Sequence, residues 1–325
     1  MARILSGIQP SGKLHLGNLT GAVSNWAALQ NKHESLFFIA DLHALTTGYS
    51  DTKDFAKSIR ELAVDLLSAG IDPDKATLFI QSQVPEHSEL HLIFSMITPL
   101  SWLERVPTYK SKIEEIKGVD LATYGFLGYP VLQAADILIY KAEFVPVGQD
   151  QLPHLELTRE IARRFNNLYG EVFPEPKEML TNFPVIPGLD GRKMSKSYGN
   201  SIALSDHTDE IRKKVSLAVT DPARIKKDDP GHPEVCVVHS YYKIYGKEVS
   251  QEIDKKCRAG AIGCVECKKQ LAEILVKALE GPREKRKELE KDPKKVDDIL
   301  EKGRKKASEE SRRTLSEVKK AMHLI

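Results

Sequence analysis

The chain has 325 residues, of which 41% are apolar and 29% charged, which is enough for one large α/β domain and a smaller second domain. The formal net charge of +2 neither favours nor excludes nucleic acid, so any RNA contact must come from local basic patches. No apolar run reaches the ~18 residues of a membrane span, and the N-terminal residues lead directly into a strand-like run without a cleavable signal. We therefore expect a cytoplasmic protein with no membrane contact.

The first part of the chain alternates strand-like and helix-like segments. Short apolar runs predict buried strands at 3–8, 35–40 and 76–81, and helical spacing predicts helices at 19–31 and 54–69. This order predicts an α/β fold, with a Rossmann-like parallel sheet covered by helices. Ligands of such a sheet bind at the carboxyl ends of its strands.

The remaining segments predict a helical insertion at about 85–128 and a second, all-helical domain. Residues 131–140 and 144–147 resume the core, and a helix follows at 155–165. Beyond residue 205 the pattern is almost entirely helical, at 209–219, 235–245, 248–257 and 267–279 and in two charged helices to the end. We expect domains at 1–200 and 201–325. Most charges of 281–325 are expected on solvated helix faces, with Arg283, Lys285 and Arg286 as candidates for contacts with RNA phosphate.

A first candidate phosphate loop covers residues 10–18, Pro-Ser-Gly-Lys-Leu-His-Leu-Gly-Asn. His15 can donate to phosphate, and Gly17 lets backbone N–H groups approach a nucleotide closely. The reaction that we expect is attack of an amino-acid carboxylate on the α-phosphate of ATP, which needs positioning and charge neutralisation. A strand-ending turn with a satisfied histidine explains this segment equally well when it is taken alone.

A second candidate loop follows roughly 180 residues later, at 193–197, Lys-Met-Ser-Lys-Ser. Lys193 and Lys196 can meet the charge that develops on a leaving pyrophosphate. The flanking Gly188 and Gly191 suggest a loop that closes on ATP and opens on product. An ordinary surface loop is the alternative, but the five-residue pattern in this place favours the functional interpretation.

The candidate substrate pocket lies at 129–138, Tyr-Pro-Val-Leu-Gln-Ala-Ala-Asp-Ile-Leu. Asp136 interrupts an apolar run, where an unpaired carboxylate is costly. One interpretation is an aspartate on a helix face with a local hydrogen bond. The other is an acceptor that waits for a ligand donor, and the indole N–H is a donor only.

The four cysteines, Cys236, Cys257, Cys264 and Cys267, occur together in the helical part with the spacing C-x20-C-x6-C-x2-C. Such clustering in a cytosolic chain favours a metal site over disulfides. Four thiolates suit tetrahedral zinc and an iron–sulfur cluster equally. The alternative is four unrelated buried thiols.

Together the two loops resemble the signature of class I aminoacyl-tRNA synthetases. The stretch 129–138, with 145–154, 6–12 and 41–46, narrows the resemblance to bacterial tryptophan–tRNA ligases, over nearly the whole chain. The resemblance implies that Asp136 binds the indole nitrogen, that Tyr129 and Gln151 hold the α-ammonium, and that Val145 and Val147 line the ring. Catalytic roles fall to His15, Lys193 and Lys196. The positions implied around ATP are Gln9, Pro10, Ser11, Gly17, Asn18, Gly148, Gln149, Asp150, Ile186, Lys193, Met194, Ser195, Lys196 and Ser197. Gln133 and Leu5 depart from the Met and the aromatic residue common in that family.

What the resemblance implies is activation of L-tryptophan with ATP and Mg²⁺ to tryptophanyl-adenylate, followed by transfer to the 3′ end of tRNA(Trp). It also implies a homodimer, with 85–128 as the expected interface, and it favours a [4Fe–4S] cluster over Zn²⁺ at the cysteines. Three rivals remain: a tyrosine enzyme of the same fold, a nucleotidyltransferase that adenylylates a small metabolite, and a metal-bearing RNA-binding protein without catalysis.

Overall fold

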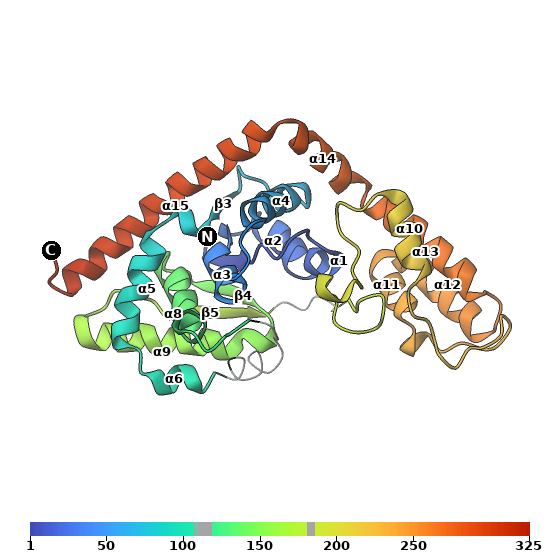
Figure 1. Ribbon diagram of the computed structural model, residues 1–325, viewed down its shortest axis with the longest axis horizontal. Helices are drawn as coiled ribbons and strands as arrows, with labels where there is room; N and C mark the ends of the chain where they lie inside the picture. Colours follow the sequence, from blue (N-terminus) through green and yellow to red (C-terminus); the bar gives the residue numbers. More distant parts are fainter. Residues whose placement is uncertain (107–108, 110–118, 181–185) are drawn as a thin grey trace.

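The computed structural model describes residues 1–106, 109, 119–180 and 186–325 (Figure 1). Residues 107–108 and 110–118 of the predicted insertion lie outside the described residues, as do 181–185. Among the described residues, none of the helices combines the length and the apolar character that a bilayer crossing requires.

A five-stranded parallel sheet forms the centre of the described structure. Its strands are β1 (Arg3–Ile8), β2 (Glu34–Ile39), β3 (Ala76–Ile80), β4 (Phe144–Val147) and β5 (Lys177–Leu180), in the order β3-β2-β1-β4-β5. β1 and β2 pair from Arg3 with Glu34 to Ile8 with Ile39, and β1 pairs with β4 at Ile4 and Phe144. The strand order reverses between β1 and β4, and this switch point is where open α/β sheets bind their ligands. The predicted Rossmann-like sheet is confirmed.

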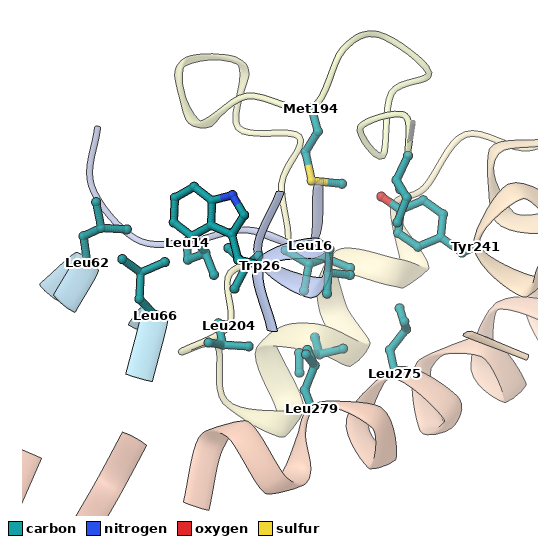
Figure 2. Close-up of a cluster of buried hydrophobic side chains, with 14 of the residues drawn as sticks. Leu14, Leu16, Trp26, Leu62, Leu66, Met194, Leu204, Tyr241, Leu275 and Leu279 are labelled. Atoms are coloured by element: carbon teal, nitrogen blue, oxygen red, sulfur yellow. The ribbon is translucent and has the colours of Figure 1, made fainter. Parts of the chain in front are cut away.

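Helices cover both faces of the sheet, because successive residues of a strand point to opposite faces. On β2, Phe37 joins the core cluster that contains Trp26 and Leu66, whereas Phe38 joins the cluster that contains Phe94 and Leu138. Trp26 and Phe37 stack with their ring centroids 4.6 Å apart. The first cluster, shown in Figure 2, continues from the sheet layer into the helices beyond residue 201.

The helices of the sheet region follow the predicted order with one difference. The segment predicted as one helix at 19–31 consists of a π-helical turn (Leu19–Val23) and α2 (Ser24–Leu29), and a short helix, α1 (Leu16–Asn18), precedes it. The predicted helix at 54–69 is confirmed as α4. The other helices of this region are α3 (Asp41–Gly48), α4 (Phe55–Ser68), α5 (Glu86–Ile97), α6 (Leu100–Glu104), α8 (Tyr124–Ile139) and α9 (Leu152–Tyr169), with short 3-10 turns at Gln81–Gln83 and Gln149–Gln151.

Beyond residue 205 the structure is helical, as predicted. The helices are α10 (Thr208–Ser216), α11 (Val237–Tyr245), α12 (Lys247–Arg258), α13 (Cys264–Ala278), α14 (Glu280–Lys291) and α15 (Pro293–Ala321). α10, α11, α12 and α13 pack on one another, whereas α14 packs on α4, and α15 packs on β3, α5 and α8 (Figure 1). The last two helices thus lie against the sheet region, and the division into domains at residue 200 stays a prediction.

The long helix α15 covers β3, an edge strand of the sheet. Its backbone approaches so closely that a Cβ atom on Gly303 would overlap the carbonyl oxygen of Leu78. Val296 and Leu300 of α15 enter the first core cluster, and Leu315 enters the second. Coverage of this kind protects the unpaired edge of a sheet from pairing with another chain.

Candidate active site

The two predicted phosphate loops meet at the carboxyl end of β1. Gly17 N–H lies 3.2 Å from Met194 Sδ, and Lys196 Nζ donates to the carbonyl of Ser11 at 3.3 Å. The backbone behind the second loop also binds the first, because Leu16 N–H donates to the Ile202 carbonyl at 2.9 Å. Segments far apart in sequence thus form one site, and Figure 2 shows Met194 above Leu16.

His15 caps the short helix α1 and is held in one tautomer. Its Nδ1 accepts the N–H of Asn18 at 3.3 Å, and the Asn18 side chain accepts the N–H of His15 at 3.4 Å. Because Nδ1 acts as the acceptor, the proton of the neutral ring resides on Nε2. Burial, followed by the charge of Lys196, lowers the pKa of His15 to about 4. The ring is therefore a neutral Nε2–H donor at pH 7.

The two lysines of the second loop differ in their surroundings. Lys196 is half-buried, and burial lowers its pKa to about 8, while the carboxylates of Asp65 and Glu61 act against this shift. Lys193 is exposed, and its backbone pairs with Pro187. A site that holds two cationic groups at different depths can neutralise a pyrophosphate.

Asn200 shapes the second loop, and sequence reasoning missed it. Its side-chain oxygen accepts the N–H of Ser195 at 2.8 Å, and its amide nitrogen donates to Asp190 at 2.7 Å and to the Lys193 carbonyl at 3.1 Å. A Cβ on Gly188 would overlap the Asn200 side chain. Gly188 therefore allows Asn200 to pack closely against the backbone. Closure of the loop 193–197 on ATP stays a prediction.

Asp136 lies on α8, is 1% exposed, and is bonded to three donor side chains of the protein. His43 Nε2 lies 2.8 Å from Oδ2, His87 Nδ1 lies 2.6 Å from Oδ1, and Gln81 Nε2 donates to both oxygens at 2.8 and 2.9 Å. These donors come from α3, the turn at Gln81–Gln83 and α5, so the interpretation of a local hydrogen bond on the helix face is wrong. A further hydrogen bond from a ligand stays a prediction. Burial raises the pKa of Asp136, but the hydrogen bonds of His43 and His87 outweigh burial and lower it to about 2.

Two of the three partners of Asp136 lie shortly after strands, and this position is the signal that sequence reasoning overlooked. His43 lies on α3 just after β2, and Gln81 immediately follows β3. His87 Nε2 in turn lies 2.7 Å from the hydroxyl of Tyr140. Because the ionised Asp136 only accepts hydrogen bonds, His87 donates to it from Nδ1.

The other predicted substrate residues lie at the carboxyl end of β4 and on α8. Val145 and Val147 are buried in β4. Gln151 donates from its side-chain nitrogen to Asp150 at 2.9 Å. The Tyr129 hydroxyl lies 3.2 Å from His154 Nε2. Tyr129 and Asp136 are seven residues apart on α8 and therefore share one side of the helix.

The positions predicted around ATP flank the switch point between β1 and β4. Gln9, Pro10 and Ser11 follow β1, and Gly148, Gln149 and Asp150 follow β4, where the 3-10 turn begins. Ile186 is buried in the first core cluster. Ser195 lies directly before a 3-10 turn at Lys196–Tyr198 that includes Ser197.

The four cysteines gather at the ends of α11, α12 and α13. None is in a disulfide, and all lie within the described residues. Burial, together with the neighbouring Cys236, Cys257 and Cys264, raises the pKa of the Cys267 thiol to about 12, although Tyr242 acts against this shift. The Arg224 guanidinium lies 3.8 Å from the sulfurs of Cys257 and Cys264.

In this structure the four thiols are not arranged in the geometry of a metal site. In the part of the chain that the structure describes, no group of three or more His, Cys, Asp or Glu side chains is arranged to hold an ion. Neutral thiols have no mutual attraction that would bring their sulfurs to coordination distance, since metal binding itself supplies that energy. One shared cluster of four thiols beside a guanidinium is nevertheless a donor set that fits a four-thiolate centre.

The expectation that Arg286 contacts RNA phosphate is wrong. Arg286 is 5% exposed and forms ion pairs with Asp65 and Glu61 and, at 2.9 Å, with Glu290. Its charge is thus neutralised within the protein. The pattern of alternating charges did not reveal this, because the partners Asp65 and Glu61 lie on α4, more than 200 residues away in sequence.

Comparisons with known proteins place the chain in a family. Residues 1–280 match the family of tRNA synthetases class I (W and Y). The chain is 51% identical over 326 residues to the tryptophan–tRNA ligase of Thermotoga maritima, with 99% of both chains covered. It is 47% identical over 393 residues to the tryptophan–tRNA ligase of Aquifex aeolicus, with 99% of this chain and 100% of the relative covered. In structure it is similar to tryptophanyl-tRNA synthetase from Campylobacter jejuni complexed with ADP and tryptophan, with a TM-score of 0.90, 35% identity and 99% of both chains covered.

Proposed function

From the premise that this chain belongs to the class I tRNA synthetases for tryptophan and tyrosine and acts as a tryptophan–tRNA ligase, we propose how its residues divide the reaction. L-Tryptophan and ATP form tryptophanyl-adenylate and pyrophosphate, and tryptophan then passes to the 3′ end of tRNA(Trp). The observation that carries this proposal is the meeting of the two loops at the switch point of the sheet, with Lys196 on Ser11 and Met194 on Gly17.

The nucleotide side of the site binds ATP, which enters as its Mg²⁺ complex. His15 donates from Nε2 to a phosphate oxygen, and Lys193 and Lys196 neutralise the pyrophosphate as it departs. Because this charge develops in the transition state, these contacts act mainly on the rate of adenylate formation. The proposed ATP contacts are Gln9, Pro10, Ser11, Gly17, Asn18, Gly148, Gln149, Asp150, Ile186, Lys193, Met194, Ser195, Lys196 and Ser197.

The tryptophan side of the site is built on Asp136. All of its protein partners act as donors, so the carboxylate stays charged and can accept one more hydrogen bond, from the indole N–H. Val145 and Val147 line the ring, and Tyr129 and Gln151 hold the α-ammonium. A pocket that must satisfy such a buried acceptor rejects analogues that lack the donor.

The four thiols of Cys236, Cys257, Cys264 and Cys267 hold a [4Fe–4S] cluster, with Zn²⁺ as the alternative. Support comes from their common location and from the positive charge of Arg224 beside two of them. Four thiolates would supply all ligands of either centre. Bound there, the centre would tie α11, α12 and α13 together and add its binding energy to folding.

The region that contains α10, α11, α12 and α13 binds the anticodon of tRNA(Trp), and the enzyme is a cytoplasmic homodimer joined through the region 85–128. The exposed apolar side chains Leu92, Met96, Leu100 and Tyr124 in that region support the interface.

The test is an ATP–pyrophosphate exchange assay with each amino acid, followed by charging of total tRNA. Exchange with tryptophan alone, followed by charging, is expected. Exchange with tyrosine would identify the tyrosine enzyme, and exchange without charging would identify a nucleotidyltransferase. The absence of any exchange would leave an RNA-binding protein without catalysis.

The metal centre is tested on protein purified without oxygen. We expect a brown protein that absorbs broadly near ~400 nm and contains about four irons per chain. Stoichiometric zinc would establish the alternative centre. Protein with four free thiols and no metal would remove the site.

A further inference from the structure

The peptide of Leu14, one residue before His15, is held from two sides. Its N–H donates to Oδ2 of Asp65 at 2.8 Å, and its carbonyl accepts the N–H of Leu204 at 2.8 Å. Asp65 lies on α4, and Leu204 follows the second loop. The Leu14 side chain is also buried, between Trp26 and the α4 residues Leu62 and Leu66 (Figure 2). The position of Leu14 therefore determines the position of the next residue, His15.

The carboxylate that binds Leu14 is itself held by an arginine from the C-terminal part of the chain. Asp65 is 0% exposed, and its second oxygen accepts a hydrogen bond from Arg286 on α14. Burial raises the pKa of Asp65, and the charge of Arg286 and the Leu14 N–H act against that shift. A cleft of about 750 Å³ lies beside the pair and is lined by Gly12, Lys13, Glu61 and Arg286 among others, so the pair lies directly behind the ATP-binding loop.

Stability alone is a weak reason for such a pair. A buried ion pair often contributes no more than well-packed apolar side chains of similar volume, because both charges must leave water. Arg286 carries two further carboxylate partners, Glu61 and Glu290, which bind its remaining nitrogens. The planar guanidinium of Arg286 therefore orients the Asp65 carboxylate and favours its ionised form.

We propose that Asp65 and Arg286 are positioning residues for the ATP-binding loop, in which Arg286 orients the Asp65 carboxylate and Asp65 holds the Leu14 peptide so that His15 faces the phosphates. The proposal rests on the proposed function, since it assumes that residues 10–18 bind ATP. Neither residue touches the substrates in this scheme. They act through the backbone of Leu14.

The chain offers a matched control for the alternative that the pair merely fastens α14 to α4. Arg60, also on α4, pairs with Asp297 of α15 at 2.6 Å and donates to the Pro293 carbonyl at 2.8 Å. This pair too joins α4 to the C-terminal helices. It is exposed to solvent and makes no contact with the loop in the described structure.

The experiment compares two double variants that both remove the buried charges. Asp65→Asn/Arg286→Met keeps an oxygen acceptor for Leu14, whereas Asp65→Leu/Arg286→Met has the same shape without an acceptor. The assays are tryptophan-dependent ATP–pyrophosphate exchange at varied ATP, tryptophan binding by equilibrium dialysis without ATP, and thermal unfolding. We expect the Leu variant to have a kcat/KM for ATP about tenfold below that of the Asn variant, equivalent to about 1.36 kcal/mol. Tryptophan affinity should agree within about twofold, and Arg60→Met should keep the wild-type exchange kinetics.

Equal kcat/KM values for ATP in the two double variants would overturn the inference, as would a parallel loss of tryptophan affinity. If a double variant does not fold, Arg286→Lys replaces it, since lysine keeps the positive charge but lacks the planar set of N–H donors. It should lower kcat/KM for ATP at unchanged tryptophan affinity, and wild-type kinetics would overturn the inference. A wild-type protein without tryptophan-dependent exchange would instead refute the proposed function.

Discussion

Replacement of Asp136 by Asn tests the centre of the proposed tryptophan pocket. In the wild-type structure Gln81 donates to both oxygens of the carboxylate, and His43 and His87 each lie against one of them. The introduced asparagine replaces one of these oxygens by an NH₂ group, which cannot accept from the amide nitrogen of Gln81. One buried donor left without an acceptor costs about 1–3 kcal/mol of unfolding free energy.

The same substitution removes the charged acceptor of the indole N–H. A hydrogen bond to a charged group contributes about 1.5–3 kcal/mol, so kcat/KM for tryptophan in the exchange assay should fall about 10- to 160-fold. Asp221→Asn is the matched control, because Asp221 is also buried and accepts from the ring and backbone of His232, far from the pocket. It should lower stability and leave tryptophan kinetics unchanged.

The pH dependence of stability adds a second measurement. The pKa of Asp136 is lowered to about 2 in the folded protein, below the ordinary 3.8 of an aspartate. A depressed pKa stabilises the fold above the unfolded pKa, and this contribution, about 2 kcal/mol, is lost as the pH falls from about 4 to about 2. In urea unfolding, the difference in the free energy of unfolding between wild type and Asp136→Asn should become smaller as the pH falls over that range. Unchanged exchange kinetics with tryptophan would remove Asp136 from the pocket, and equal kinetic losses in both variants would reduce its role to stability.

Four further outcomes are expected. Replacement of Lys193 and Lys196 by Ala should lower kcat for adenylate formation far more than it weakens tryptophan binding. Because the ammonium of Lys196 loses its proton as the pH rises through about 8, kcat/KM for ATP should fall above that pH, and Lys196→Arg should move the fall to higher pH; an unmoved profile would exclude Lys196 as its cause. Gly303→Ala should lower the free energy of unfolding by about 1–3 kcal/mol through overlap with Leu78, whereas Gly281→Ala, with open space around it, should change it by less than about 1 kcal/mol. Cys264→Ser should abolish any iron content and loosen the helical region while adenylate formation survives; retained iron would show that Cys264 is not a ligand.

Much of the sheet and of the site could be predicted from the sequence because the signals are local. β1, β2 and β3 are short apolar runs, and α4 is an amphipathic segment that ends two residues before Gly70, which has a positive φ. The loops at 10–18 and 193–197 carry recognisable residues, and the βαβ order predicts that motifs after strands share one edge of the sheet.

Other features depended on partners that the sequence does not place together. The donors that hold Asp136 come from positions 93, 55 and 49 residues away, His43, Gln81 and His87. Arg286 has the same local charge pattern whether it faces water or a buried carboxylate, and only the packing of α14 on α4 makes it an internal ion pair. Local propensity determines which segments form strands and helices, but pairing between buried polar groups depends on where those segments pack, because a buried charge is tolerated only where the fold brings its partners within hydrogen-bond distance.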